Sequence, residues 1–171
     1  MPALTTPYRI GALGKNHDRA TFDCGSAALD RYLQLQAGQD AEKSVAAPFV
    51  LTQPPALRVL GYYTLSAALV NANELPDSLA RKLPRYPQLP VTLLGRLAVD
   101  QSMKDRGIGQ FLYALRRSFE AAVNIAAMAV LIDAKNEAAE TFYRHFSFLP
   151  LHQQPRRLFL PMKTVAGLLA E

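Results

Sequence analysis

Cysteine is almost absent from the chain, whose 171 residues include only Cys24. A single cysteine forms no internal disulfide, which is typical of proteins in a reducing cytoplasm. No motif for a catalytic base surrounds Cys24, so we interpret it as a small buried or half-buried hydrophobic side chain and not as a nucleophile. We therefore expect a cytoplasmic protein.

Histidine is also scarce, and the patterns typical of metal and membrane proteins are missing. His17, His145 and His152 are isolated, without an i/i+4 pair or a neighbouring cysteine, which argues against a metal site. No apolar run reaches the ~20 residues that a membrane-spanning helix needs. The N-terminus has no basic region followed by an apolar core, so we expect no secretory signal.

Strand-like and helix-like segments alternate along the chain without repeats or low-complexity linkers. The hydrophobic pattern predicts strands at residues 8–13, 49–52, 57–67, 91–99, 129–133 and 158–162. It predicts helices at residues 27–42, 77–83, 109–124 and 137–146. Asp23 or Ser26 is the expected cap of the first helix. This alternation indicates an α/β or α+β sheet covered by helices, and the length fits a single domain over residues 1–171.

The most informative segment is residues 104–109, with the sequence Lys-Asp-Arg-Gly-Ile-Gly. It lies between a predicted strand and a predicted helix, whose first N–H groups lack internal partners and carry partial positive charge. Gly107 and Gly109 allow an anion to approach the backbone closely, and Arg106 adds a planar donor that matches a phosphate. The segment predicts a pyrophosphate site; the alternative is an ordinary turn before a surface helix.

Two common nucleotide loops are excluded. The chain has no G-x-x-x-x-G-K-[ST] run, so it has no P-loop. The Rossmann pattern G-x-G-x-x-G requires a third glycine where this chain has Leu112.

A basic residue followed by x-x-Gly-x-Gly, here Lys104 to Gly109, instead resembles the acetyl-CoA loop of the GNAT N-acetyltransferases. A strand followed by Asn136, then by Phe142 and Tyr143, resembles the same family. The resemblance implies a single mixed, mostly antiparallel sheet that is splayed at its central strands and flanked by helices. Asp105 departs from the family pattern because glycine is common there, and Ser147 replaces the glycine before a phenylalanine.

Other segments resemble one group within that family, the tRNA-acetylating toxins of bacterial toxin–antitoxin modules (TacT type). They extend over nearly the whole chain, at residues 22–25, 29–30, 61–66, 74–76, 83–87, 94–100 and 158–162. This resemblance implies transfer of acetyl from acetyl-CoA to the α-amino group of aminoacyl-tRNA, which blocks translation. It also implies a ribbon-helix-helix antitoxin as partner and a homodimer.

The resemblance further implies a two-part acetyl-CoA site. The main chain of Leu97, Ala98 and Val99 would pair with the pantetheine amides in the manner of an added strand. The residues implied for the pyrophosphate are Lys104, Arg106, Gly107, Ile108, Gly109 and Gln110. Asn136 would bond the pantetheine arm; its position also fits a helix N-cap, and it could do both.

Tyr143 is the candidate general acid, which would protonate the departing thiolate. It lies seven residues after Asn136, about two helical turns, so both side chains face one side. The alternative is a core aromatic residue. Residues 92–99 contain no acid that could serve as a base. An α-amine, with a pKa of ~7.7–8.0, needs a base less than lysine does at ~10.4, which favours an α-amine acceptor.

The net charge of +5 favours a polyanionic partner. The candidate RNA contacts are Arg81, Lys82, Arg85, Arg96, Arg156 and Arg157. An arginine within an apolar strand, as at Arg96, demands a partner or an open groove. Two alternatives remain: a GNAT enzyme that acetylates a protein or small-molecule amine, and a non-catalytic module of the same fold that binds CoA or nucleic acid.

Overall fold

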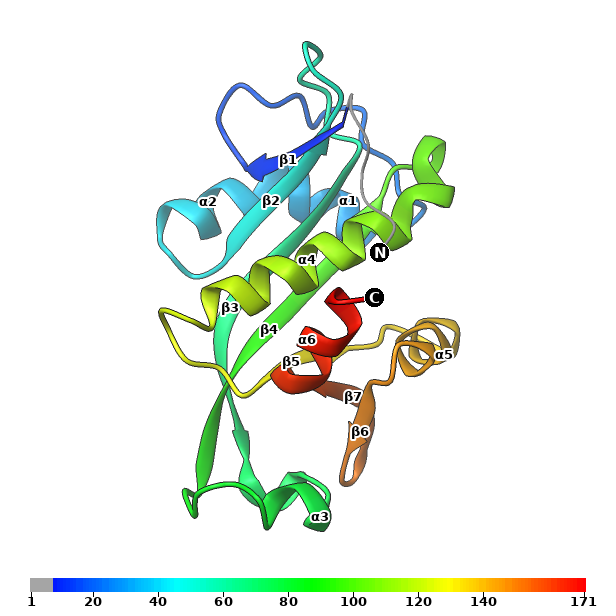
Figure 1. Cartoon of the computed structure of the whole chain (residues 1–171). Helices are drawn as coiled ribbons and strands as arrows, with labels where there is room; N and C mark the ends of the chain where they lie inside the picture. Colours follow the sequence, from blue (N-terminus) through cyan, green and yellow to red (C-terminus); the bar gives the residue numbers. More distant parts are fainter. Residues whose placement is uncertain (1–7) are drawn as a thin grey trace. The chain divides into compact units, whose positions relative to one another are not determined.

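The computed structural model of the protein describes residues 8–171, and for residues 105, 106 and 155 it describes the main chain alone. The strands are β1 (Arg9–Ala12), β2 (Ala47–Thr52), β3 (Gly61–Asn71), β4 (Gln88–Val99), β5 (Ala129–Asp133), β6 (Leu149–Leu151) and β7 (Gln154–Pro161). They form a seven-stranded sheet in the order β1-β2-β3-β4-β5-β7-β6 (Figure 1). The pairs β1–β2, β2–β3, β5–β7 and β6–β7 are antiparallel, whereas β4 and β5 are parallel. The predicted mixed, mostly antiparallel sheet is confirmed.

The helices agree largely with the sequence pattern. They are α1 (Ala27–Arg31), α2 (Ala37–Glu42), α3 (Asp77–Ala80), α4 (Gly107–Ala121), α5 (Glu137–His145) and α6 (Met162–Leu169). A π-helical turn, Tyr32–Gln36, joins α1 to α2, so residues 27–42 form the continuous helical stretch that was predicted. Ser26 and not Asp23 is its cap, because the Ser26 hydroxyl accepts a hydrogen bond from Leu29 N–H at 3.4 Å.

The strand β3 begins and ends four residues later than predicted. The pattern predicts a strand at residues 57–67, but β3 begins at Gly61, opposite Leu51 of β2. The segment before it is hydrogen-bonded elsewhere: Asp18 N–H donates to the Leu57 carbonyl, and Val59 N–H donates to the Asp18 carbonyl, both at 2.8 Å. Val59 and Leu60 of this segment are nevertheless buried beside residues of the sheet, whereas Leu57 is exposed, so the hydrophobic pattern does not show where β3 begins.

Two elements, β6 and α6, were not predicted. β6 has only three residues with Pro150 in the middle, and so falls below the length at which an alternating pattern is visible. α6 follows Pro161 directly and contains Gly167, a residue that lowers helix propensity. Its apolar character resembles that of a buried strand, so periodicity alone does not identify it.

The described residues fold as two compact units, one of residues 8–66 and 95–115 and the other of residues 67–94 and 116–171. The first unit has a core between the helical stretch 27–42 and the strands β2, β3 and β4. Its buried members are Phe22, Tyr32, Leu33, Ala37, Val50, Val59, Tyr62 and Ala98. The carboxyl-terminal half of β4 belongs to this unit.

The second unit has its own core beside β5. Leu89 and Val91 of β4 are buried whereas Gln88 and Pro90 are exposed, the period of two expected of a strand with one covered face. β5 is buried at Ala129–Ile132 throughout, as expected of a strand in the interior of a sheet. The buried core members are Val70, Leu75, Leu89, Val91, Ala129, Leu131, Leu151 and Phe159.

Candidate functional site

The segment from β4 to α4, predicted as a glycine-rich turn, is helical in the structure. Residues Gln101–Arg106 form a 3₁₀ helix, and α4 begins at Gly107, ahead of the predicted start at residue 109. Asp100 caps the 3₁₀ helix through its side chain, and the helix is kinked at Met103, whose φ of −123° and ψ of 21° are not helical. Lys104 is exposed on this helix. The side chains of Asp105 and Arg106 lie outside the described part of the chain.

Gly107 has an ordinary helical backbone, with φ −61° and ψ −34°. A Cβ atom built there would contact only Val99 Cγ2, at 3.8 Å, which is a normal van der Waals distance. Neither its conformation nor its packing against the described residues therefore requires glycine at this position. Glycine in a helix costs about 1 kcal/mol relative to alanine, so its presence is consistent with the close approach of a ligand. Ile108 is 45% exposed beside it, and Gly109 is half-buried.

Gln110 is fully buried, and its side chain connects α4 to the sheet. Its Nε2 atom donates to the carbonyls of Tyr62, at 3.2 Å, and Ala98, at 3.0 Å. Its Oε1 atom has no hydrogen-bond partner in the described part of the chain. A Cβ at Gly61 would lie 2.3 Å from this oxygen, so Gly61 cannot carry a side chain while Gln110 holds this position. Only the main chain of Gln110 remains for an anion.

The predicted pantetheine strand is the end of β4. Leu97 and Val99 are half-buried, whereas Ala98 is 7% exposed and belongs to the core of the first unit. The carbonyl of Ala98 already accepts the Gln110 amide. Of the three residues, Leu97 and Val99 therefore retain more freedom to pair with a ligand.

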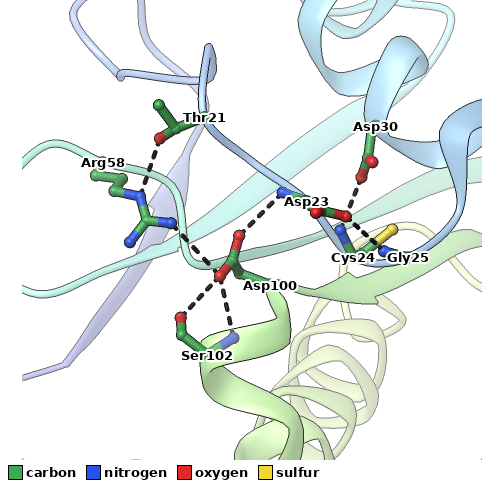
Figure 2. A network of polar contacts seen from close by, with 8 residues as sticks. All are labelled: Thr21, Asp23, Cys24, Gly25, Asp30, Arg58, Asp100 and Ser102. Carbon is green, nitrogen blue, oxygen red and sulfur yellow. Dashed lines mark hydrogen bonds and ion pairs between the residues drawn. The ribbon is translucent and has the colours of Figure 1, made fainter.

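Asp100, directly after β4, is the residue that sequence reasoning missed at this site. It is 4% exposed, and Figure 2 shows the groups around it. One carboxylate oxygen accepts from Asp23 N–H at 2.9 Å. The other accepts from Ser102 N–H at 3.1 Å and from the Ser102 hydroxyl at 2.7 Å, and lies 3.4 Å from Arg58 Nη2. Burial opposes ionisation of Asp100, but these hydrogen bonds and the Arg58 charge outweigh it and lower its pKa.

The loop before α1 is held to the same network (Figure 2). Gln101 N–H donates to the Asp23 carbonyl at 2.9 Å. The Asp23 carboxylate accepts from Gly25 N–H at 3.0 Å, and the Asp30 carboxylate accepts from Cys24 N–H at 2.9 Å. The start of the proposed pyrophosphate turn and the loop that begins α1 are therefore fixed by shared main-chain contacts.

Arg96 of β4 has a partner within the first unit. Its guanidinium carbon lies 3.5 Å from the centroid of the Tyr32 ring, a cation–π contact. The Tyr32 hydroxyl donates to the Asp40 carboxylate at 2.7 Å, and burial together with this hydrogen bond raises the pKa of Tyr32 to about 12. Arg96 was predicted to need a partner or an open groove, and its partner is the ring of Tyr32.

Asn136 and Tyr143 belong to the second unit. The Asn136 side chain accepts a hydrogen bond from Ala139 N–H at 2.9 Å, so its predicted role as N-cap of α5 is confirmed. Tyr143 is 8% exposed and packs against the rings of Phe142 and Phe148. Burial raises the pKa of Tyr143 to about 12, which keeps the hydroxyl protonated at neutral pH and able to donate a proton.

The predicted RNA contacts differ in their surroundings. Arg81, Lys82 and Arg85 are exposed after α3, and none of them pairs with a carboxylate in the described part of the chain. Arg156 is exposed on β7, whereas Arg157 donates from Nε to the Asp133 carboxylate at 3.0 Å. Arg157 therefore has a partner on the neighbouring strand.

The described residues include no cluster of three or more histidine, cysteine, aspartate or glutamate side chains that could hold a metal ion. Within the same residues, no helix has both the length and the apolar character needed to cross a membrane.

No family model matches the chain, but searches of known proteins and solved structures find similar toxins. The chain is 33% identical over 173 residues to the tRNA-acetylating toxin of Mycobacterium tuberculosis, an alignment that covers 100% of both proteins. It is similar to the structure of AtaT complexed with acetyl-methionyl-tRNAfMet, with 31% identity and a TM-score of 0.86 over 94% of this chain and 98% of that one. It is also similar to a variant of AtaT bound to the C-terminus of the antitoxin AtaR and acetyl-CoA, with 26% identity and a TM-score of 0.79 over 96% and 99% of the two chains.

Proposed function

The chain belongs to the tRNA-acetylating toxins, and from this membership we propose that it transfers the acetyl group of acetyl-CoA to the α-amino group of an aminoacyl-tRNA. Acetylation removes the reactive lone pair of that amine, so the aminoacyl group cannot form the next peptide bond and translation is blocked. The observation that carries the proposal is the identity to a tRNA-acetylating toxin over the full length of both proteins. The likeness to AtaT in complexes with acetyl-methionyl-tRNAfMet and with acetyl-CoA supports it.

Acetyl-CoA binds at the end of β4 and the start of α4. The main chain of Leu97 and Val99 pairs with the pantetheine amides, and the N–H groups of residues 107–110 bind the pyrophosphate. The unstrained glycine at position 107 supports this assignment, because nothing within the chain requires it. Lys104 and Arg106 add positive charge, and Asn136 bonds the pantetheine arm.

The reaction needs an attacking amine and a proton for the leaving group. The amine nitrogen attacks the thioester carbonyl, a C–N bond forms and the C–S bond breaks. The amine releases a proton to solvent, the CoA thiolate takes one from Tyr143, and the tyrosinate regains a proton from solvent. The hydroxyl of Tyr143 is protonated at neutral pH, so a proton is available, although burial raises its pKa to about 12 and makes it a weaker acid. Residues 92–99 contain no acid, which suits an α-amine that is already partly neutral.

The tRNA binds to exposed cations. Arg81, Lys82 and Arg85 form the main contact and Arg156 adds to it, because these side chains have no carboxylate partner in the described part of the chain. Arg96 and Arg157 contribute less, since a ring and a carboxylate already engage them.

The remaining proposals concern assembly. We propose that residues 1–171 act as one acetyltransferase domain, because the match to the Mycobacterium toxin covers both chains completely. We also propose a cytoplasmic homodimer that a ribbon-helix-helix antitoxin neutralises. The complex of AtaT with the C-terminus of its antitoxin supports an antitoxin as partner.

A single assay tests the central proposal. The protein is incubated with labelled acetyl-CoA and, separately, with aminoacylated tRNA, deacylated tRNA, free lysine and a peptide with a free N-terminus. Label should enter aminoacylated tRNA alone, because the acceptor amine belongs to the amino acid. Transfer to lysine or to the peptide at an equal rate would show a general acetyltransferase, and no transfer at all would favour a non-catalytic module.

A further inference from the structure

A hollow of about 460 Å³ lies on the hairpin between β3 and β4, in the second unit. Figure 1 shows this hairpin with the short helix α3 at its end. The lining residues are Asp77, Ala80, Arg81, Leu83 and Arg85. The volume lies within the ~300–1,000 Å³ that is ordinary for small-molecule sites. Its lining combines apolar and charged side chains, so it suits a ligand that has both an apolar part and a charged part.

The floor of the hollow is anchored to a core. Ala80 and Leu83 are half-buried and pack against the buried cluster of the second unit. Main-chain hydrogen bonds hold the segment that follows: Leu83 N–H donates to the Ala80 carbonyl at 3.2 Å, and Ala72 N–H donates to the Pro87 carbonyl at 3.0 Å. Prolines at 84 and 87 restrict the backbone further. A ligand here would therefore meet a preformed surface and lose little free energy to ordering it.

The charges around the hollow are mostly positive and uncompensated. Arg81 and Arg85 line it and Lys82 is exposed between them, without a carboxylate partner in the described residues. Arg81 Nε donates to the Asp77 carbonyl at 3.3 Å, which restrains the direction of its guanidinium. Asp77 contributes a carboxylate, a group that repels a phosphate but accepts hydrogen bonds from the amino group of a base.

Tyr86 is the next residue after Arg85, and its side chain is 63% exposed. This exposed ring is available to stack on a flat ligand. Proteins that bind single-stranded nucleic acid combine a cationic groove for the backbone with aromatic rings on which bases stack. The hollow and Tyr86 together have these two parts.

We propose that this hollow holds one unpaired nucleotide of the tRNA substrate, with its phosphate on Arg81 and Arg85 and with Tyr86 stacked on a base. The inference rests on the proposed function and adds to it a subsite for single-stranded RNA. A duplex would reach the cations through its phosphates but would keep its bases paired and away from the ring. The subsite therefore favours an unpaired segment of the tRNA over its helical stems.

The absence of tryptophan from the chain allows a direct test. In the variant Tyr86→Trp, fluorescence reports from this position alone. A short single-stranded RNA should quench the emission in a saturable manner below about 100 µM, the weak limit of non-specific nucleic acid binding. A blunt duplex of the same sequence should not. The control Val123→Trp, at a side chain that is 79% exposed after α4, should remain unquenched.

Turnover gives a second, independent readout. Tyr86→Ala should raise KM for aminoacylated tRNA about tenfold, because one stacked base is lost, while KM for acetyl-CoA is unchanged. Tyr86→Phe retains the ring and should behave as the parent. Lys163→Ala removes an exposed cation on α6 and should change neither constant.

The results of these two experiments distinguish failure of the nucleotide subsite from failure of the proposed acetyltransferase function. Equal quenching by duplex, quenching by an acidic peptide instead of RNA, or no quenching overturns the subsite. If aminoacylated tRNA is still acetylated in that case, the proposed function stands without it. Quenching by single-stranded RNA together with no acetylation of aminoacylated tRNA would support the RNA subsite and overturn the enzymatic proposal.

Discussion

The carboxylate of Asp100 joins three segments of the first unit: the loop before α1 through Asp23, the β3 approach through Arg58, and the 3₁₀ helix through Ser102. A buried carboxylate is stable only when such donors surround it. Because the 3₁₀ helix leads directly into α4, this network sets where the proposed pyrophosphate turn begins. We interpret Asp100 as a positioning residue.

The ionisation of Asp100 should make stability depend on pH. Its pKa is lowered in the folded state from the ordinary 3.8, so it stabilises the fold above that pH and the contribution is lost as pH falls through the lower folded value. Asp100→Asn should cost about 2 kcal/mol at pH 7, where charge-assisted hydrogen bonds are lost. Denaturant unfolding of both proteins at pH 7 and pH 3 measures this; a gap that stays constant would contradict it.

A second prediction concerns the hydroxyl group of Tyr143. Tyr143→Phe removes only the hydroxyl, so the ring contacts with Phe142 and Phe148 and the fold should persist. Loss of a general acid should lower kcat by about 10²–10⁴ while acetyl-CoA affinity is retained. Because burial raises the pKa of Tyr143 to about 12, the loss should be the same at pH 7 and pH 9. Parental turnover would make Tyr143 a packing residue.

Single residues could be predicted from the sequence where their partners are local. The cap by Asn136 depends on Ala139, three residues away, and its position before a helical pattern is visible in the chain. Asp100 was missed because Asp23, its partner, lies 77 positions away. The contact of Arg96 with Tyr32 likewise joins a strand to a helical stretch, and only the general need for a partner was predictable.

At the scale of elements, the passage from β4 into α4 contains a glycine that disfavours the helix. Gly107 lies in the first helical turn with ordinary dihedral angles, and alanine would fit there. The glycine lowers the stability of the helix, and no contact with the described residues requires it. Such a local conflict is expected where a site needs the space for something else.

Gly107→Ala should therefore separate stability from binding. The variant should be more stable by up to about 1 kcal/mol, because alanine favours the helix, yet bind acetyl-CoA more weakly since its methyl group occupies the space of the pyrophosphate. Gly167→Ala in α6 is the matched control: a Cβ there meets open space, so stability should rise with no change in affinity. Calorimetric titration and thermal unfolding measure both, and unchanged binding by Gly107→Ala would contradict the assignment of the turn.

Helices and strands were predictable where the hydrophobic period of a segment and the secondary-structure propensity of its residues agree. β5 matches its prediction at residues 129–133 because a short apolar run that includes Val130 and Ile132 and ends at Asp133 is typical of an interior strand. The π-helical turn at Tyr32–Gln36 was not predictable, since a continuous helical pattern does not record where one hydrogen-bond register changes to another. The strand β3 begins later than predicted because Val59, although buried like a strand residue, donates its N–H to the Asp18 carbonyl.

At the scale of the whole molecule, the net charge of +5 is the property that sequence alone establishes. Its distribution needed the structure, because some of the cations are neutralised locally. Arg58, Arg144 and Arg157 lie in ion pairs, whereas the group at Arg81, Lys82 and Arg85 does not. The positive charge and its cluster at residues 81–85 were thus visible in the sequence, but the engagement of Arg96 by a ring and of Arg157 by a carboxylate was not.

Replacing Arg81, Lys82 and Arg85 together by glutamate should test that surface. The triple variant changes the net charge from +5 to −1, because each replacement subtracts two. A matched control replaces the exposed lysines Lys15, Lys43 and Lys163 by glutamate, with the same change in net charge. If tRNA binds to these three cations, the first variant should raise KM for aminoacylated tRNA at least tenfold more than the control does. The affinity for acetyl-CoA should be unchanged in both variants.

The dependence on salt then distinguishes local contacts from the overall field. Each lost phosphate contact should reduce the slope of log affinity against log salt by about 0.7–0.9, so the hairpin variant should lose roughly two from the slope of the parent. The control should shift affinity through long-range attraction, which salt screens beyond about 10 Å, while its slope changes less. Equal slopes for the two variants would mean that tRNA responds to the net charge alone. The hairpin cations would then not be the contact surface, and the nucleotide subsite beside Tyr86 would lose its phosphate anchor.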